Sequence, residues 1–403
     1  MALSVYVHIP YCLQRCRYCD FTTFEQSEIM APEKYVGWVV QEIRRRHSFW
    51  PTHEIETLYF GGGTPSLLAP ELIVTICREL ANVGFAFTAD CEITLEINPA
   101  TLSEAKLDAY MHAGFNRFSV GAQTFNDALL KMCGRRHSAA DTRETLRLLR
   151  KFQLNYSFDL LFALPGQTLN DVKLDLDEVT SFAPPHLSAY CLTVPETHPM
   201  SLGRPPEDEQ IEMFEAIETH LHLDGLEKYE ISNFARPGLE SRHNLAYWRD
   251  RSYWGLGLSS HSYDQTHGDF GMRFWNSKAL PEYGDQCIKS GLEFSEVLPA
   301  TQREALLEHE SLTDFCHMFL RTLSGLSEEA LRKKFRPEAI ACVLTRLEPL
   351  VASELLSAGA GAFCLTPKGQ LISNKVFEEL TFLKGDLPQG GLTPAVSNSY
   401  CSV

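Results

Sequence analysis

The sequence predicts an α/β protein with a six-stranded parallel sheet whose outer side is covered by helices. Three observations lead to this class. Apolar strand-like runs alternate with amphipathic helical segments six times between residues 4 and 194. Polar and glycine-rich segments recur where these strands end, as expected when the carboxyl ends of parallel strands share one edge. The alternation stops near residue 205, after which we expect a smaller, helical unit.

The expected elements follow one another in strict order. The first strand, residues 5–9, alternates along its length and stops at Pro10. The next segment, 32–50, places its apolar residues on one helical face and begins with a proline, which the first helical turn tolerates. Later strands are expected at 56–60, 92–99, 117–120, 156–162 and 187–194, and later helices up to residue 80 and at 101–113, 141–152, 168–182 and 207–223.

Two local signals predict finer features. Thr101 and Glu104 have the spacing of a capping box at the start of a helix, and Gly114 stands where a helix commonly ends. Residues 361–372 are typical of a β-hairpin closed by a Pro-Lys-Gly turn. Together with the helices expected between 300 and 384, this hairpin gives a winged-helix-like outline, which describes a fold rather than a function.

We therefore expect four regions along the chain. Residues 1–230 carry the strand–helix repeats, and 231–299 form a connecting segment rich in aromatic residues and glycine. Residues 300–384 form the C-terminal helical domain, and 385–403 form a disordered tail.

Three cysteines after the first strand have metal-ligand spacing. Cys12, Cys16 and Cys19 form C-x3-C-x2-C, and a short loop of thiolates suits a soft metal centre. A structural zinc site needs four ligands, whereas a [4Fe-4S] cluster on three cysteines keeps one iron open for a small chelating molecule. Zinc with His8 or Asp20 as its fourth ligand is the alternative. The other nine of the twelve cysteines are scattered singly, as is usual for small buried side chains.

Further polar features are expected at the same edge of the sheet. A glycine-rich loop, residues 61–65, lets a ligand approach the backbone, although a tight turn also explains a glycine triplet. Glu96 lies between two apolar residues near a strand end, so it is either hydrogen-bonded or an outward, solvated side chain. Asp159 lies in an apolar strand and needs polar partners. Gln123 follows the fourth strand.

The motifs together resemble a known superfamily. C-x3-C-x2-C after a first strand is similar to the radical S-adenosylmethionine (SAM) superfamily. The string Y-x-H-I-P-x-C-x3-C-x-Y-C-D-F, residues 6–21, resembles its oxygen-independent coproporphyrinogen III oxidases and, among them, the heme chaperone HemW branch. The resemblance covers roughly residues 4–384. It implies a partial (β/α)6 radical SAM barrel, a [4Fe-4S] cluster on the three cysteines, and SAM on the open iron, where reductive cleavage gives a 5′-deoxyadenosyl radical.

The resemblance also implies roles for individual residues. Gly62, Gly63 and Thr64 would bind the SAM amino group, and Glu96 would bind the ribose. Arg135 would pair with the SAM carboxylate, which suits a guanidinium fork, although the neighbouring Arg136 fits a register shifted by one. Contacts to SAM are further implied for Tyr6, Tyr18, Gln123 and Asp159.

A second informative string is His243-Asn244-Leu245-Ala246-Tyr247-Trp248. A histidine beside aromatic residues is more often a satisfied core or surface side chain than a ligand. The string H-N-x-x-Y-W, however, resembles a signature of the HemW branch, in which the histidine is implicated in heme binding. Imidazole is a normal axial ligand of heme iron, so His243 is the predicted heme ligand and His261 a secondary candidate.

The sequence departs from the oxidases in two ways. They carry a fourth cysteine two residues after the third, where this chain has Phe21, and an N-terminal extension before the cluster motif. Both departures favour the chaperone over the oxidase. Separately, Ala163 replaces a usual glycine, which affects only the expected geometry of one loop.

Composition limits the partners. The formal charge of −16 disfavours non-specific binding to nucleic acid or anionic membranes. No apolar run approaches the roughly 18 residues of a membrane span. Twelve cysteines without paired spacing, and a first strand too close to the start for a signal segment, predict a cytoplasmic protein.

The sequence as a whole therefore predicts a heme chaperone on a radical SAM scaffold. The resemblance implies heme, a heme-acceptor protein and an electron donor for the cluster as partners. It leaves SAM cleavage open, and coproporphyrinogen oxidase activity is not expected. The alternatives are a true oxygen-independent coproporphyrinogen III oxidase, which decarboxylates its substrate to protoporphyrinogen IX, and a zinc-stabilised protein whose winged-helix unit binds a partner.

Overall fold

The computed structural model describes residues 2–288, 300–359 and 361–388, which fall into two compact units. The first comprises Met1–Leu306 with Arg321–Ser324, and the second Leu307–Leu320 with Gly325–Val403. The subdivision expected at residues 230, 299 and 384 stays a prediction. Residues 289–299 of the expected connecting segment and 389–403 of the expected tail lie outside the described residues.

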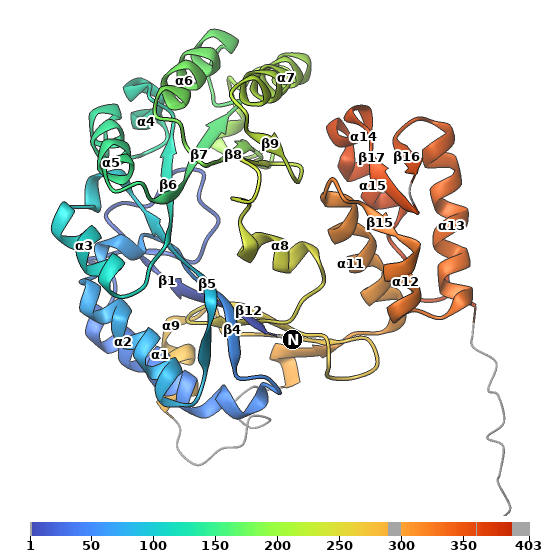
Figure 1. The fold of residues 1–403 in the computed structure, drawn as a ribbon, viewed down its shortest axis with the longest axis horizontal. Coiled ribbons are helices and arrows are strands. Elements are labelled where there is room, and N and C mark those ends of the chain that lie inside the picture. The colour runs from blue at the N-terminus through green and yellow to red at the C-terminus, as the bar shows by residue number, and fades with distance from the viewer. Residues whose placement is uncertain (1, 289–299, 360, 389–403) are drawn as a thin grey trace, which may run out of the picture. The chain divides into compact units, whose positions relative to one another are not determined.

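Six parallel strands in consecutive order form the centre of the first unit. They pair as β1-β4-β5-β6-β7-β8, each parallel to its neighbours. Helices follow the strands and cover their outer side (Figure 1). The strands are β1 (Leu3–Ile9), β4 (Glu54–Gly62), β5 (Ala86–Ile97), β6 (Arg117–Gln123), β7 (Asn155–Phe162) and β8 (His186–Cys191), and the helices are α1 (Pro32–Arg46), α2 (Pro70–Asn82), α3 (Glu104–His112), α5 (Ala139–Lys151), α6 (Leu169–Ser181) and α7 (Glu207–Leu223). The predicted α/β class and partial (β/α)6 barrel are confirmed.

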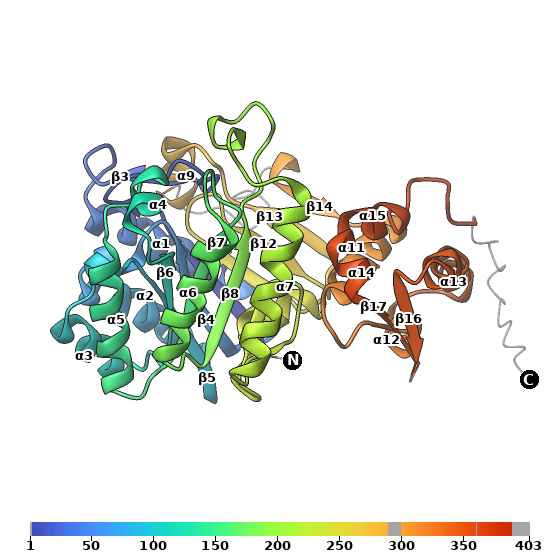
Figure 2. The ribbon, with the colours of Figure 1, turned by 90° about the horizontal axis from the view of Figure 1, so that it is seen from above.

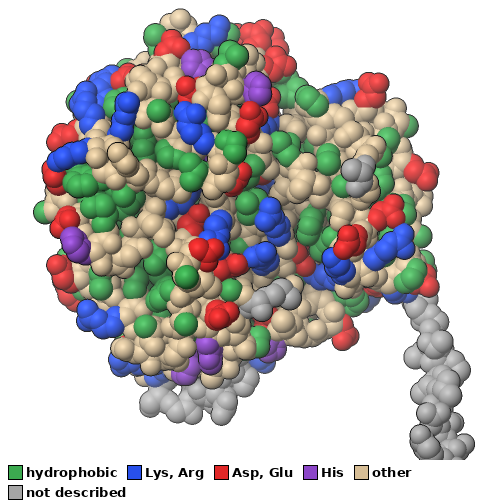
Figure 3. Space-filling model, in the orientation of Figure 1, with side chains coloured by type: hydrophobic (Ala, Val, Ile, Leu, Met, Phe, Trp, Pro, Cys, Tyr) green, Lys and Arg blue, Asp and Glu red, His purple; other side chains and the backbone are tan. Residues whose placement is uncertain are grey.

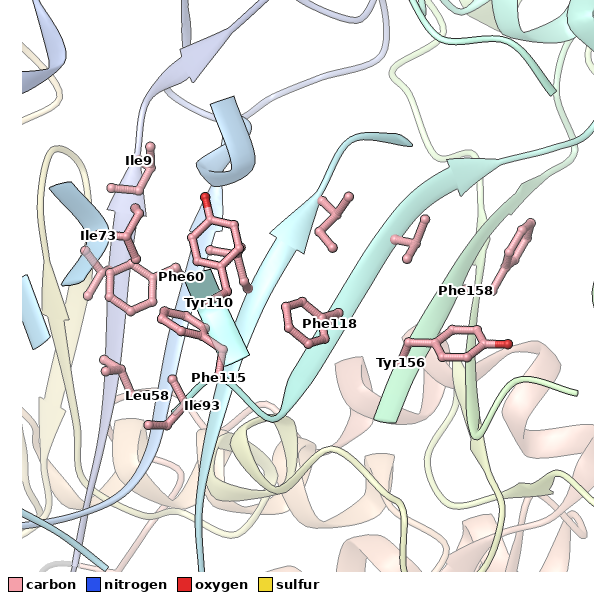
Figure 4. Close-up of a cluster of buried hydrophobic side chains, with 14 of the residues drawn as sticks. Ile9, Leu58, Phe60, Ile73, Ile93, Tyr110, Phe115, Phe118, Tyr156 and Phe158 are labelled. Atoms are coloured by element: carbon pink, nitrogen blue, oxygen red, sulfur yellow. The ribbon is translucent and has the colours of Figure 1, made fainter. Parts of the chain in front are cut away.

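The core lies between the sheet and its helices. Figure 4 shows Phe60 of β4 and Phe118 of β6 beside Tyr110 of α3, and all three are fully buried. Phe115, just before β6, packs against both Phe60 and Tyr110 with ring centroids 5.5 Å apart. Burying one such side chain contributes about 1.5–3 kcal/mol, so this layer fixes the register of the strands.

That register brings polar residues of neighbouring strands side by side. Glu96 pairs with Ser119, Ser119 with Ser157, and Asp159 with Ser188. Residues two apart on a strand share a face, so Ser157 and Asp159 point the same way. The inner face of the sheet is therefore polar where its outer face is apolar.

Further strands extend the sheet at both edges. Beside β1 lies β11 (Tyr253–Leu256), which is parallel to it. The antiparallel strands β12 (His261–Asp264), β13 (Met272–Trp275) and β14 (Arg303–Ala305), labelled in Figure 2, follow in this order. Beside β8 lie β10 (Asn233–Ala235) and β9 (Glu227–Lys228), both antiparallel to their neighbours. Among its described residues, this unit also contains β2 (Tyr11–Cys12), β3 (Phe24–Glu25), α4 (Asp127–Met132), α8 (Arg242–Trp248), α9 (Leu280–Ile288) and short 3-10 helices.

A buried ion pair ties α1 to the extended edge. Arg46 donates to the Glu42 carboxylate one turn earlier and to Asn276 Oδ1. Glu42 also accepts from Gly257 N at 2.9 Å and from the Tyr283 hydroxyl at 2.7 Å. A buried ion pair is tolerated only with such additional hydrogen bonds.

One predicted helix start is wrong. Thr101 belongs to a short 3-10 helix, Pro99–Thr101, and its hydroxyl donates to Asn98 O. The α-helix begins after Ser103, whose side chain accepts from Lys106 N. Pro99 favours the tight turn that precedes the helix, so the N-cap moves two residues along. The predicted stop at Gly114 is confirmed by its left-handed φ of +93°.

The second unit combines helices with a three-stranded antiparallel sheet in the order β15-β17-β16. The hairpin expected over residues 361–372 is wrong, because only its first half is a strand. That strand, β17 (Ala362–Leu365), pairs with the preceding β16 (Leu356–Gly359), and the Pro-Lys-Gly segment forms no turn between strands. Pro367 instead begins helix α14, capped by Thr366, whose side chain accepts from Gly369 N. The remaining elements are α11 (Glu308–Arg321), β15 (Leu326–Ser327), α12 (Glu328–Lys334), α13 (Pro337–Ala352), α14 (Pro367–Leu371) and α15 (Ser373–Glu379).

Charges of both signs are interspersed over the face of the molecule seen in Figure 3. Among the described helices, none combines the length and apolar character that a membrane crossing requires.

Candidate functional site

A cavity of about 480 Å³ is lined by residues of five of the six parallel strands, β4 to β8, and reaches their carboxyl ends. Its volume lies within the roughly 300–1,000 Å³ typical of small-molecule sites. The wall contains every predicted cluster and SAM residue except Tyr6: Cys12, Cys16, Tyr18, Cys19, Gly62, Gly63, Thr64, Glu96, Gln123, Arg135 and Asp159. Residues from five strands and three loops thus converge on one site.

The cysteine loop forms one side of the cavity. It runs between β2 and β3, which pair in parallel, and the Arg17 N–H donates to Cys133 O at 3.0 Å. Burial, with a smaller contribution from the neighbouring thiols, raises the pKa of Cys12 to about 11. Burial also raises the pKa of Cys19. Thiolates are disfavoured there without a cation, so the loop fits a positively charged metal centre.

The three thiols do not surround a single ion. Among residues 2–288, 300–359 and 361–388, no three histidine, cysteine or acidic side chains converge as ligands of one metal. The His8 imidazole is occupied, because Nε2 lies 2.9 Å from Thr22 O and Nδ1 lies 3.1 Å from the Tyr6 hydroxyl. In a cluster each cysteine binds a different iron. This arrangement fits a cluster better than zinc with His8.

The glycine-rich loop requires glycine at two positions. Gly62 has a φ of +110°, which disfavours other residues. A Cβ atom at Gly63 would lie 2.6 Å from Tyr11 O and 3.1 Å from Cys12 Sγ. The loop therefore passes directly against the cysteine loop. A bare tight turn would explain Gly62 but not Gly63.

Glu96 faces the cavity rather than bulk solvent. Its carboxylate accepts hydrogen bonds from the Tyr59 hydroxyl at 2.9 Å and from Gly62 N at 3.0 Å. Burial, together with the charge of Asp159, raises the pKa of Glu96 to about 7. The outward, solvated alternative for Glu96 is therefore wrong.

Asp159 lies deeper, among serine hydroxyls. It accepts from Ser119 at 3.0 Å and from Ser157 at 3.1 Å. Burial raises the pKa of Asp159, whereas these hydrogen bonds and the Arg117 charge oppose the rise. The polar partners expected for a buried aspartate are present.

Arg135 closes the cavity beside the cysteines. Its guanidinium lies 3.4 Å from Cys16 Sγ and donates to Gly121 O. Arg136 is absent from the wall, which favours the register that assigns Arg135. Gln123 lines the cavity and has a left-handed φ of +70°. Its side chain therefore points in a direction that differs from that of a regular β-strand residue.

Tyr6 and His243, both predicted site residues, lie outside the wall. The Tyr6 ring stacks on Tyr59 at 6.1 Å, behind the cavity surface. His243 is buried, its Nδ1 lies 2.8 Å from Thr57 Oγ1 and its Nε2 lies 2.9 Å from the Tyr247 hydroxyl. Burial lowers the pKa of His243 to about 3, so the ring is neutral. An axial-ligand role requires the ring to leave both hydrogen bonds.

The secondary heme candidate is differently placed. His261, at the start of β12, is exposed and stacks on Trp275 with ring centroids 6.0 Å apart. Phe21, which replaces the oxidases' fourth cysteine, lines the cavity and is 63% exposed. Ala163 has a left-handed φ of +59°, which explains why glycine suits that position.

Sequence reasoning missed several residues of the wall. Arg117 and Ser119 of β6, Ser188 and Tyr190 of β8, and Asn244 of α8 all line the cavity. A signal existed for the strand residues, because polar side chains two apart point to one face. Asn244 comes from a helix far along the chain, and no local pattern assigns it to this site.

Comparison with known proteins places these features in context. Residues 6–179 match the family described as the radical SAM superfamily. The heme chaperone HemW of Bacillus subtilis is 33% identical over 383 residues, covering 93% of this chain and 98% of that protein. The heme chaperone HemW of Escherichia coli is 35% identical over 264 residues, covering 64% of this chain and 69% of that protein. The coproporphyrinogen III oxidase structure from Escherichia coli, a radical SAM enzyme, superimposes with a TM-score of 0.79 at 23% identity, covering 94% and 90% of the two chains.

Proposed function

Because this chain belongs to the heme chaperone HemW family of the radical SAM superfamily, we propose that it binds heme and passes it to an acceptor protein. Its scaffold would hold a [4Fe-4S] cluster and SAM. The single observation that supports this scaffold most strongly is the convergence of the cysteine loop, the glycine-rich loop and Glu96 on one cavity. An electron donor for the cluster and a heme-acceptor protein are the partners that the proposal requires.

The residues present fit the two cofactors. Cys12, Cys16 and Cys19 would hold the cluster, and Phe21 offers no further thiol. When bound, the cluster would supply an electron to SAM. Heme carriage itself requires no covalent chemistry, so the proposal does not depend on the use of that electron.

The cavity wall would hold SAM through distinct contacts. Glu96 would accept hydrogen bonds from the ribose hydroxyls, and the backbone of Gly62–Thr64 would meet the amino group. Arg135 would pair with the carboxylate through its guanidinium fork. Tyr18, Gln123 and Asp159 would contact other parts of SAM, and Tyr6 would act from behind, through Tyr59.

The heme ligand proposed from the sequence is His243, provided that its imidazole leaves its present hydrogen bonds. Its imidazole has to leave Thr57 and Tyr247 before a nitrogen reaches iron. Replacement of His243 by alanine then abolishes the axial ligation and shifts the heme absorption spectrum. An unchanged heme affinity and spectrum would remove His243 from the heme site.

The alternative function, that of a coproporphyrinogen III oxidase, is tested by a direct assay of that activity. The protein, reconstituted with iron and sulfide under anaerobic conditions, is incubated with SAM, a reductant and coproporphyrinogen III. Cys16→Ala, which lacks one proposed cluster ligand, is the matched control. We expect no protoporphyrinogen IX from either protein. Catalytic accumulation of protoporphyrinogen IX by the wild type alone would replace the chaperone by the oxidase.

A further inference from the structure

His243 lies just behind the cavity wall, and its contacts lead into the wall. Its imidazole stacks on Tyr59 with ring centroids 5.0 Å apart and planes 24° from parallel. Tyr59 lines the cavity and donates from its hydroxyl to Glu96 Oε1 at 2.9 Å. A continuous path of contacts therefore joins the imidazole to the carboxylate through one aromatic ring.

The imidazole is itself held in place from several sides. Thr57 and Tyr247 contact its two ring nitrogens at 2.8 and 2.9 Å, and its backbone N–H donates to Glu92 Oε1 at 3.0 Å. Thr57 and Tyr59 are two residues apart on β4 and so share its inner face. His243 therefore contacts both inward side chains of this strand, and its position fixes that of the Tyr59 ring.

The surrounding packing leaves Tyr59 and Glu96 little freedom. A Cβ atom at Gly61 would lie 2.8 Å from both Tyr59 Cε1 and Glu96 Oε1. Tyr6 covers the Tyr59 ring at a centroid distance of 6.1 Å. Asn244, which follows His243, lines the cavity itself. The first turn of α8 is thus part of the wall, although it lies about 150 residues after Glu96.

We propose that His243 is a positioning residue of this cavity, which acts through Tyr59 to hold the Glu96 carboxylate in the orientation that binds a ligand diol. The inference rests on the proposed function, because the diol is the ribose of SAM. In this role His243 contacts neither SAM nor the cluster. Its neutral ring, held by two hydrogen bonds, provides a fixed surface on which the Tyr59 ring stacks.

Loss of the His243 imidazole should weaken SAM binding by a predictable amount. Without His243 the Tyr59 ring gains freedom, and its hydrogen bond to Glu96 is made for only part of the time. A hydrogen bond of this kind contributes about 3- to 10-fold to affinity. The loss should depend on Glu96, because the path ends there.

The test is a double-mutant cycle on the reconstituted protein, with labelled SAM and equilibrium dialysis. We expect His243→Ala to weaken SAM binding about 3- to 10-fold in the wild-type background and by no more than experimental error in the Glu96→Ala background, which lacks the acceptor of the Tyr59 hydroxyl. Iron content and thermal unfolding are measured for each variant. Trp248→Phe is the matched control, since Trp248 shares the helix but stacks on Arg321 at 4.6 Å rather than on the wall. It should leave SAM affinity unchanged.

A second variant protects the test against misfolding. Tyr247→Phe removes only the partner of Nε2 and keeps every ring in place. It should give a smaller loss of SAM affinity, which also vanishes in the Glu96→Ala background.

Three results would overturn the inference. An unchanged SAM affinity together with a lowered heme affinity in His243→Ala would assign the residue to heme alone. Equal losses in both backgrounds would show that His243 acts by a route that bypasses Glu96. A wild-type protein that holds four irons but binds no SAM would refute the proposed SAM site itself, and it is recognised before any variant is compared.

Discussion

Substitution of Glu96 should raise the stability of the ligand-free protein while it weakens ligand binding. Burial and the charge of Asp159 raise the pKa of Glu96 from 4.5 to about 7, against the opposing hydrogen bonds from Tyr59 and Gly62. Between these two pH values the folded protein holds a proton on Glu96 that the unfolded chain has released. The contribution of Glu96 to stability therefore falls as the pH rises through this window and stays low above pH 7.

The magnitude follows from the two pKa values. Integrated from pH 5 to pH 8, the raised pKa lowers the free energy of unfolding by about 2.5 kcal/mol. Glu96→Gln cannot ionise, so it escapes this loss. Its stability relative to the wild type should rise by about 2.5 kcal/mol between pH 5 and pH 8. The glutamine amide forms a weaker hydrogen bond with the Gly62 N–H than the carboxylate does. This loss of stability is the same at both pH values, so it cancels when the two stability differences are subtracted.

The assay is urea unfolding of the cluster-free, reduced protein at both pH values. All five tryptophans lie in the first unit, so their fluorescence reports that unit alone. Tyr59→Phe provides an independent check, because it removes a hydrogen bond that lowers the pKa of Glu96 and should move the transition to higher pH. A difference between wild type and Glu96→Gln that is the same at pH 5 and pH 8 would refute the reasoning.

Three further predictions follow from the same structure. Cys16→Ala should abolish most of the bound iron, whereas Cys191→Ala should retain it; equal iron contents would contradict the assignment of the cluster. Gly63→Ala should destabilise the protein by about 1–3 kcal/mol, because the added Cβ meets backbone oxygens. Gly37→Ala, on an exposed helical site with open space, should stabilise it by about 1 kcal/mol. Chemical denaturation measures both changes, and a stabilising Gly63→Ala or a destabilising Gly37→Ala would contradict this packing. Arg46→Met should cost about 3–5 kcal/mol by leaving a buried glutamate unpaired, and a cost near zero in the same assay would show that the carboxylate finds other partners.

The strand order and the shared site were predictable because both follow from periodicity. Apolar runs of strand length define the parallel sheet, and the side chains at their carboxyl ends have to meet at one edge. Glu96 and Asp159 could be found in this way, since each is a carboxyl group within an apolar strand. Arg117 and Ser188 were missed although the residues two positions along their strands, Ser119 and Tyr190, are also polar and indicated a shared face.

The errors arose where two local signals competed. Thr101 has capping-box spacing, but Pro99 two residues earlier favours a 3-10 turn, and Ser103 becomes the cap. The Pro-Lys-Gly segment contains typical turn residues, yet proline is equally suited to the first turn of a helix. Choosing between such signals depends on the packing of the segment, which sequence spacing does not contain.

His243 illustrates a different limit. The sequence shows a histidine among aromatic residues, and this pattern suits a ligand, a core residue or a positioning residue alike. Its contacts with Thr57 and Tyr59 join segments about 185 residues apart. Long-range contacts of this kind decide the role of a side chain, and they become visible only in the folded chain.

The central claim, that this protein carries heme, is tested most directly by a heme titration. The reconstituted protein is titrated anaerobically with heme, and the Soret absorption band is followed until it saturates. We expect a saturable change that corresponds to one heme per chain. The titration is repeated without SAM in the buffer, and unaltered heme binding there would show that heme does not need the SAM site to be filled. Absorption that rises linearly with added heme, as for free heme in buffer, would contradict the account.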